Sequence, residues 1–217
     1  MSIASQARSI DDLTLKAVGA LAAKRYFEAE NLAAGALNAA RDDDDFRRMA
    51  AVLPTLQQAR TGRLALAMDV GTITILDEPF DEDVTIEPGC YLVQPPLVGA
   101  DARRLRHTAL TREIPVMVLC REPVIRLGLV PFVALGSGAT VRTKMRKPKD
   151  LEHPDLEWLV AALEALGEAA AEMDPAMSLH KRINALMTRI DAIPEHAGLH
   201  ELLEESCRKA AEVAEAS

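Results

Sequence analysis

Residues 90–120 read CYLVQPPLVGADARRLRHTALTREIPVMVLC, and this stretch decides the fold class. It begins and ends with short apolar runs of strand length, and the segment between them has apolar residues at the helical spacing of three or four. The order strand 90–94, helix 101–112, strand 114–120 is a βαβ unit. Such a unit has two parallel strands joined by a right-handed crossover. We therefore expect a sheet that carries at least one helix.

Four further segments are rich in the β-branched and apolar residues typical of strands, namely 70–76, 83–86, 127–135 and 139–145. The last two flank Gly136-Ser137-Gly138, a connection short enough for a β-hairpin. Because this hairpin is antiparallel and the βαβ unit is parallel, the sequence predicts a small mixed sheet.

Helical spacing precedes the sheet region. Residues 10–41 predict two helices with a turn at Lys24-Arg25-Tyr26, and a third helix is expected from about residue 46 to residue 67. The four aspartates at 42–45 come directly before that helix, where carboxylates cap free amides and oppose the helix dipole. We expect Pro54 to kink or interrupt the third helix.

Helical spacing also follows the sheet region. After a linker at 147–154, three helices are expected at 155–173, 178–191 and 195–214, separated by prolines. The fold class is therefore α+β, with an N-terminal helical hairpin plus a third helix, a small mixed sheet with a βαβ unit, and a C-terminal three-helix segment. Changes in composition divide the chain into regions 1–68, 69–149 and 150–217.

The sequence Tyr26-Phe27-Glu28-Ala29, with Ala36-Leu37 beginning seven residues after Ala29, resembles the second helix of a tetratricopeptide repeat. The resemblance covers residues 10–41. It departs from the family pattern in its first-helix glycine, displaced to Gly19, and one repeat later, where Arg63 replaces a small residue. The resemblance implies a hairpin of that style that binds protein, without a repeat array.

The composition sets limits on compartment and partners. Three cysteines in 217 residues form no CxxC pair, so we expect neither a disulfide framework nor a cysteine zinc site, and a reducing, cytoplasmic location fits. We recognise no secretion signal and no run of 18 apolar residues, so we expect neither secretion nor a membrane partner. Aromatic residues make up only 3%, which does not favour base stacking on nucleic acid.

The net charge of −8 conceals a segregation of charge along the chain. Residues 1–68 sum to +1, residues 69–100 to −7, residues 101–149 to +8 and residues 150–217 to −10. Asymmetry of this kind concerns electrostatic fields and partners more than the fold.

The carboxyl ends of the strands at 90–94 and 114–120 are one candidate site. If these strands are parallel, the loops after them meet at one sheet edge, where open α/β sheets favour ligands. Four polar residues would line a crevice for a small anionic ligand there: Gln94, Asp101, Arg121 and Glu122. The alternative is a packed loop edge in which they satisfy neighbours. No glycine-rich nucleotide motif accompanies them.

A basic patch is the second candidate. On the strand after the glycine turn, alternation places Val141, Thr143 and Met145 on one face and Thr140, Arg142, Lys144 and Arg146 on the other. Further cations on the preceding helix are Arg103, Arg104 and Arg106. They could protect a sheet edge, meet the chain's own acidic segments, bind an acidic protein or bind nucleic acid.

Two constellations with catalytic or metal residue types are interpreted as structural. Cys120 ends a strand beside Arg121, but a nucleophile needs a base and nothing places His107 near it. His196 and His200 are four residues apart with Glu204 on the same face, yet HExxH is absent. We expect these histidines to lie on the surface, and we expect no metal.

The sequence thus contains no catalytic constellation. The leading hypothesis is a non-catalytic protein–protein interaction or scaffold protein without a cofactor. The alternative is a small anionic ligand-binding module or enzyme that uses the crevice after strands 90–94 and 114–120. The third is nucleic-acid binding through the basic strand 140–146. The partner, the process and the oligomeric state do not follow from the sequence.

Overall fold

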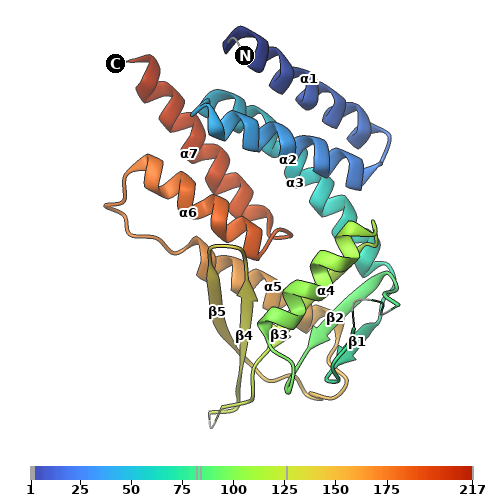
Figure 1. The fold of residues 1–217 in the computed structure, drawn as a ribbon. Helices are drawn as coiled ribbons and strands as arrows, with labels where there is room; N and C mark the ends of the chain where they lie inside the picture. Colours follow the sequence, from blue (N-terminus) through green and yellow to red (C-terminus); the bar gives the residue numbers. More distant parts are fainter. Residues whose placement is uncertain (1–2, 82, 84, 126, 217) are drawn as a thin grey trace. The chain divides into compact units, whose positions relative to one another are not determined.

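The computed structural model describes residues 3–81, 83, 85–125 and 127–216. In these residues three helices precede a five-stranded mixed sheet, one helix lies between the second and third strands, and three helices follow (Figure 1). The expected α+β class is confirmed. No helix in the described part of the chain is both long enough and apolar enough to cross a membrane.

Contacts within the chain define two compact units. The helical unit comprises Met1–Gly62, Met173–Met187 and Ala197–Ser217, and the sheet unit comprises Arg63–Glu172 and Thr188–His196. Both units draw on distant parts of the sequence, whereas the three regions expected from composition are contiguous.

The helical unit begins with a hairpin of α1 (Ile3–Ala22) and α2 (Tyr26–Asp42). Its turn falls where the sequence predicts it. Small side chains form the seam, since Ala20, Ala29 and Ala59 are fully buried in one cluster. Alanine seams allow helix backbones to approach closely, and this accounts for a core with so few aromatic residues.

Helix α3 (Phe46–Met68) starts as predicted, because the Asp45 carboxylate accepts a hydrogen bond from the Arg48 amide at 3.0 Å. The expectation that Pro54 interrupts this helix is wrong, since α3 is helical through Pro54. Proline removes one backbone donor there, but buried neighbours on both sides, Leu53 and Leu56, hold the helix in the core.

The sheet unit contains five strands in sequential order, β1 (Ile73–Leu76), β2 (Gly89–Val93), β3 (Val116–Arg121), β4 (Leu129–Leu135) and β5 (Thr140–Arg146). β1, β2 and β3 are mutually parallel, β4 pairs with β3 antiparallel, and β5 pairs with β4 antiparallel. The expected mixed sheet, βαβ unit and hairpin are therefore confirmed.

One expected strand does not form. Of residues 83–86, the described ones (83, 85 and 86) lie outside any strand, and residue 84 falls outside the described residues. Ile86 is instead buried as a single apolar anchor in the core cluster of the sheet, while Asp83 and Thr85 stay exposed. A single buried side chain can pack in the core without backbone hydrogen bonds to a neighbouring strand. The sequence pattern therefore predicted a strand that the structure does not contain.

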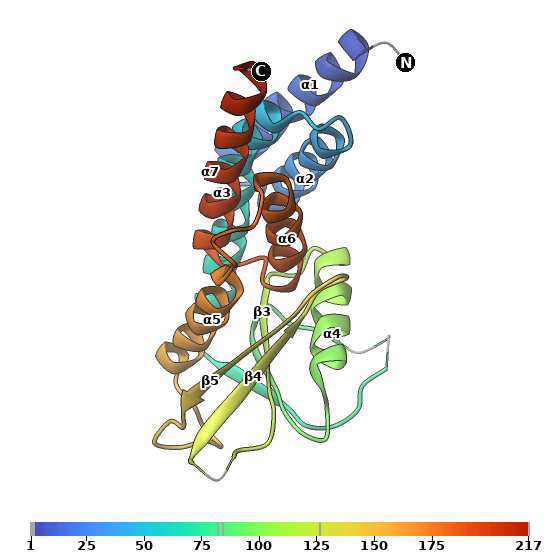
Figure 2. The same cartoon turned by 90° about the vertical axis from the view of Figure 1, so that its left-hand side faces the viewer.

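Helices cover the two faces of the sheet. Figure 2 shows α4 (Gly99–Thr111) and α5 (Leu156–Ala171) on opposite sides of it. Val133 of β4 packs in the cluster that includes Leu105 of α4. The preceding residue, Phe132, has its ring centroid 5.2 Å from that of Trp158 on α5. Successive strand residues point to opposite faces, so both faces are buried.

The chain ends with α6 (Leu179–Ala192) and α7 (Ala197–Glu215). Polar contacts tie α7 to α3 in the helical unit, because Gln57 donates to the Glu201 carboxylate at 3.2 Å and Arg60 contacts His200 at 3.0 Å. Since residue numbers rise along α3 as they fall along α7, the two helices are antiparallel.

Candidate functional site

The parallel pairing of β2 and β3 brings two of the predicted crevice residues together. Gln94 Oε1 accepts hydrogen bonds from Arg121 Nε at 3.0 Å and from Arg121 Nη2 at 2.6 Å. Gln94 Nε2 in turn donates to Asp77 Oδ2 at 3.2 Å. These three side chains form a chain of contacts across the carboxyl ends of β1, β2 and β3. Arg121 therefore already has an oxygen acceptor within the protein.

The other two predicted residues have different partners. Helix α4 starts at Gly99, two residues before the expected start, so Asp101 lies in its first turn and accepts a hydrogen bond from the Val98 amide at 2.9 Å. This carboxylate supplies the negative charge that an external anion would bring to the helix N-terminus. Glu122 lies 3.5 Å from Arg142 Nε on β5. A ligand at this edge would have to compete with these internal contacts.

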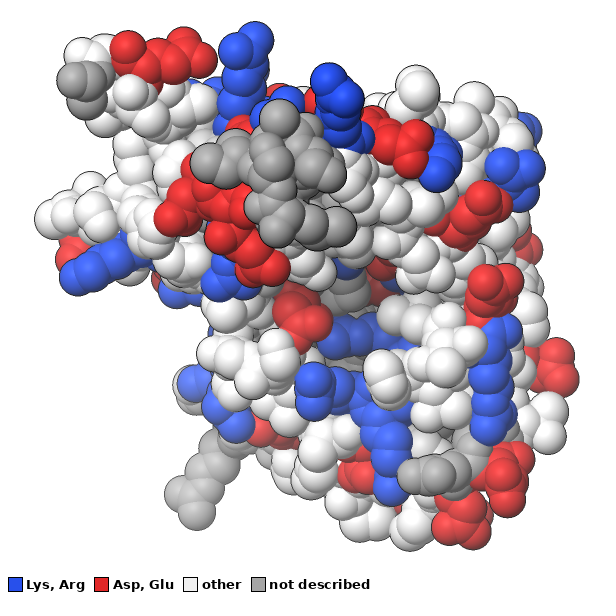
Figure 3. All heavy atoms as spheres, turned by 45° about the horizontal axis from the view of Figure 1, so that its top comes forward, with Lys and Arg blue, Asp and Glu red and all other residues white. Residues whose placement is uncertain are grey.

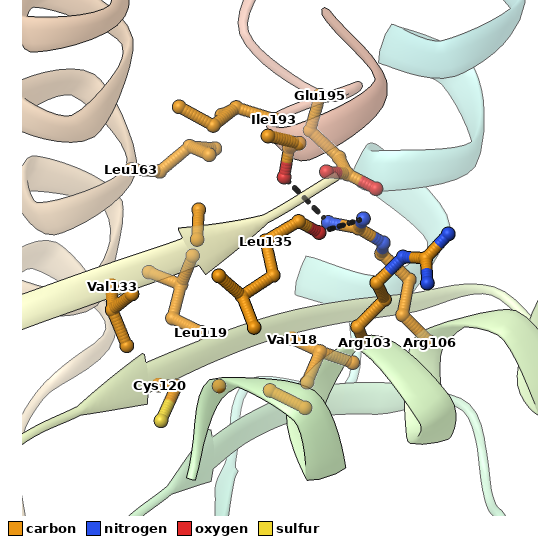
Figure 4. A pocket seen from close by; sticks show the side chains of 14 residues that line it. Arg103, Arg106, Val118, Leu119, Cys120, Val133, Leu135, Leu163, Ile193 and Glu195 are labelled. Atoms are coloured by element: carbon orange, nitrogen blue, oxygen red, sulfur yellow. Dashed lines mark hydrogen bonds between the residues drawn. The ribbon is translucent and has the colours of Figure 1, made fainter. Parts of the chain in front are cut away.

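A cavity lies near the same edge, between α4, β3, β4, α5 and the end of α6 (Figure 4). Its volume is about 10 Å³, which is room for one water molecule. Figure 4 shows Arg103, Arg106 and Glu195 at one end and the Cys120 sulfur at the other. Arg106 closes the cavity at the arginine end, where its guanidinium donates to the carbonyl oxygens of Ala192 and Leu135 at 2.7 and 3.3 Å. The space excludes a metabolite.

The Cys120 thiol is buried beside this cavity, and burial raises its pKa to about 12. The charges of Glu122 and Asp101 act in the same direction, and Arg121 opposes them. The thiol is therefore protonated at neutral pH, whereas a nucleophilic cysteine needs a thiolate. His107 is exposed on α4. The interpretation of Cys120 as a buried structural cysteine agrees with this environment.

The expectation that His196 and His200 lie on the surface is wrong, since they are 7% and 1% exposed. His196 lies over Gly167 of α5, where the absent side chain leaves room for the ring, and its Nε2 is 3.2 Å from Glu164. His200 Nε2 accepts from the Arg60 guanidinium, which has only donors. In the described residues no three His, Cys, Asp or Glu side chains are grouped to hold a metal.

The basic strand β5 has the alternation that the sequence predicts. Val141 is buried and Thr143 and Met145 are half-buried, whereas residues 140, 142, 144 and 146 are exposed. β5 is also the edge of the sheet, next to β4 alone. In the part of the chain that the structure describes, Lys144 and Arg146 form no ion pair within 4 Å, whereas Arg142 lies near Glu122.

Among the described residues, two of the cations of α4 have partners within the chain, in contrast to Lys144 and Arg146 of β5. Arg104 lies 4.6 Å over the Phe80 ring and 3.2 Å from Asp101, and Arg106 caps carbonyl oxygens at the end of α6. Arg103 stays exposed. Figure 3 shows acidic and basic side chains interspersed on the face it presents. The six predicted basic residues therefore do not act as one continuous patch of free charge.

A groove that the sequence reasoning missed lies in the helical unit between α3 and α7, which Figure 2 shows side by side. Its volume is about 480 Å³. We call its small lining residues the floor (Ala50, Ala51, Pro54 and Ala211) and its charged lining residues the rim (Arg47, Glu204, Arg208, Glu212 and Glu215). Sequence spacing could not pair these helices, because some 150 residues separate them; the alanines near the end of α7 were the available signal.

Comparison with known proteins identifies no relative, since no family model, no curated protein and no solved structure matches this chain. The functional assignment therefore rests on the geometry of the groove and of the sheet edge.

Proposed function

We propose that this protein is a non-catalytic interaction module that binds a helix of a partner protein in the groove between α3 and α7. The observation that carries the proposal is the alanine floor of this groove, open to solvent between two antiparallel helices. The resemblance of residues 10–41 to tetratricopeptide helices supports the same function, because that family binds proteins with helical surfaces.

The dimensions of the groove suit a helix. Its lining spans residues 47–54 of α3 and 204–215 of α7. At 1.5 Å per residue these stretches are about 10 and 16 Å long, which matches two to three turns of a bound helix. Alanines and a proline leave the floor shallow, so an apolar side chain of the partner at every third or fourth position can reach it.

The rim favours a basic partner. It carries three glutamates and two arginines. The two ion pairs within it, Arg47–Glu215 and Arg208–Glu204, are each 3.7 Å long; the first is exposed on both sides, and in the second Arg208 is exposed while Glu204 is half-buried. Exposed pairs of this kind are worth about 0–1 kcal/mol, so a partner's cations can replace the arginines at little cost. The exposed aspartates at 42–44 add negative charge just before α3.

Selection from a displayed library of amphipathic helical peptides against the full-length chain tests this function. We expect enrichment of peptides with an apolar stripe at helical spacing and flanking Lys or Arg. Ala51→Arg, which fills the floor, should weaken the selected peptides at least about tenfold, the equivalent of about 1.4 kcal/mol. Ala161→Arg, at an exposed alanine of α5, is the matched control. Equal affinity for wild type and Ala51→Arg contradicts the proposal.

The small-anion alternative at the sheet edge has weaker support, because Arg121 is already bound to Gln94 and the adjacent cavity holds only one water. A thermal-shift screen with nucleotides, phosphosugars and dicarboxylates addresses it. A ligand-induced shift that Arg121→Ala abolishes would favour it over the groove.

A further inference from the structure

The connection between β3 and β4 carries exposed apolar side chains. Leu127 is 82% exposed and Val124 is 41% exposed. Figures 1 and 2 both show the described residues of this connection at the lower end of the view, next to the start of β4. Val98, 56% exposed, ends the loop after β2, and since β2 and β3 are parallel this loop leaves the same edge of the sheet. The apolar core does not account for these three exposed side chains, one leucine and two valines, at one end of the sheet.

Basic side chains flank this apolar end. In the β4–β5 ladder Arg146 is opposite Leu129 and Lys144 is opposite Pro131, and the Lys147 amide donates to the Gly128 carbonyl at 3.3 Å. Arg146 therefore lies beside the first residue of β4, which follows Leu127 by two positions in the chain. Together with Lys149 these cations are exposed, and in the described residues none forms an ion pair within 4 Å.

We propose that this end of the β3–β4–β5 region, here called the hairpin end (Val124, Leu127, Lys144, Arg146 and Lys147), binds an anionic membrane surface. Leu127 and Val124 enter the boundary between headgroups and acyl chains, and the cations contact lipid phosphates. Association of this kind combines buried apolar area with attraction to anionic lipid. It requires no membrane-spanning helix and does not depend on the groove between α3 and α7.

Two features favour a lipid surface over nucleic acid or an acidic protein. The apolar residues of the hairpin end, Val124 and Leu127, are aliphatic, whereas single-stranded nucleic acid is bound on aromatic rings. A projecting Leu needs a complementary pocket in a protein partner, but the acyl region of a bilayer accepts it without one. The cations then remain at headgroup level, where surface potential attracts each of them.

Vesicle flotation of the full-length chain tests the proposal. We expect binding to phosphatidylcholine vesicles that contain about 30% phosphatidylserine and none to phosphatidylcholine alone, with binding lost as salt shortens the Debye length to about 3 Å at 1 M. Leu127→Asp and the pair Lys144→Glu/Arg146→Glu should each lower the partition coefficient at least tenfold. Both sites are exposed, so these variants should fold normally.

Matched controls separate the hairpin end from general effects of charge and hydrophobicity. Leu15→Asp changes an equally exposed leucine of α1, 72% exposed, and Lys24→Glu/Lys181→Glu changes the net charge by the same amount as the β5 pair. Both controls should bind vesicles as wild type does. If Leu15→Asp or the control charge pair weakens binding as strongly as the hairpin-end variants, the assignment to this surface is wrong.

A label at Leu127 gives a direct readout of insertion. The three native cysteines are buried, so Leu127→Cys provides the one exposed thiol among the described residues for an environment-sensitive fluorophore. We expect a blue shift and increased emission with anionic vesicles, and no change for the same label at Leu15→Cys. Absence of vesicle binding, an unchanged label at 127 on bound protein, or binding of mixed-sequence RNA without binding of vesicles would each overturn the proposal.

Discussion

The buried arginine of α3 gives the sharpest prediction for stability. Arg63 is 0% exposed in the sheet unit. Its Nη1 donates to the Val116 carbonyl of β3 at 3.3 Å, and its Nη2 donates to Glu195 Oε1 at 3.0 Å. The Glu195 side chain is only 5% exposed, so solvent cannot replace the guanidinium for either acceptor. Replacing Arg63 by Met keeps an unbranched apolar stem but removes the guanidinium, which leaves a buried carboxylate without its cation.

The magnitude follows from what remains after each substitution. Breaking a buried ion pair by removing one partner costs about 3–5 kcal/mol, so Arg63→Met should lower the free energy of unfolding by that amount. Glu195→Gln keeps a hydrogen-bond acceptor of the same size, and we expect about 1–3 kcal/mol. The double variant Arg63→Met/Glu195→Gln removes both charges, so its loss should be clearly smaller than the sum of the two single losses.

Urea unfolding of the full-length chain measures these free energies. Trp158 fluorescence monitors the sheet unit, because the ring packs against Phe132, and far-UV circular dichroism gives a second probe. Arg25→Met, at an exposed arginine between α1 and α2, is the control and should stay within about 0.5 kcal/mol of wild type. The reasoning fails if Arg63→Met loses less than about 1 kcal/mol, or if the double variant is as unstable as the sum.

Two further predictions concern tight packing and burial. Gly62→Ala would place a Cβ against the Tyr26 ring, so we expect a loss of about 1–3 kcal/mol in the free energy of unfolding by urea. Tyr26→Leu should relieve this loss, and an equally large loss in the Tyr26→Leu background would contradict the contact. Burial raises the pKa of all three thiols, to about 11 or 12. A thiol reagent at pH 8 should therefore react slowly with the native protein and completely with the protein unfolded in urea. A fast reaction of the native protein would show that the thiols are not buried. Since the folded-state values are raised, the stabilisation is complete below the unfolded thiol pKa of about 8.5 and is lost as pH rises toward 12.

Local patterns predicted the parts of the fold that depend on local physics. The alternation along β5 reports which side chains face α5, and the parallel pairing of β2 with β3 follows from the helix between them. The Asp45 cap of α3 was predictable because a helix start leaves free amides at fixed positions. Each of these depends on residues close together in the sequence.

Contacts between distant segments account for the errors at the candidate sites. Arg63 departs from the small-residue pattern of tetratricopeptide helices, but its acceptor is Glu195, which lies 132 residues further along the chain. The burial of His196 requires the gap above Gly167, and no spacing rule connects these two positions. The groove was missed for the same reason, since α3 and α7 meet only in the folded chain.

The charges of the two proposed surfaces decide which partners associate, and the apolar residues decide how tightly they bind. The groove has a mainly acidic rim and the hairpin end is cationic, so the net charge of −8 predicts neither partner. Exposed ion pairs contribute about 0–1 kcal/mol each, and charge complementarity acts chiefly on association rate and specificity. The affinity must therefore come from the alanine floor and from Leu127. Substitutions there should raise dissociation rates, whereas charge reversals at the rim or on β5 should mainly slow association.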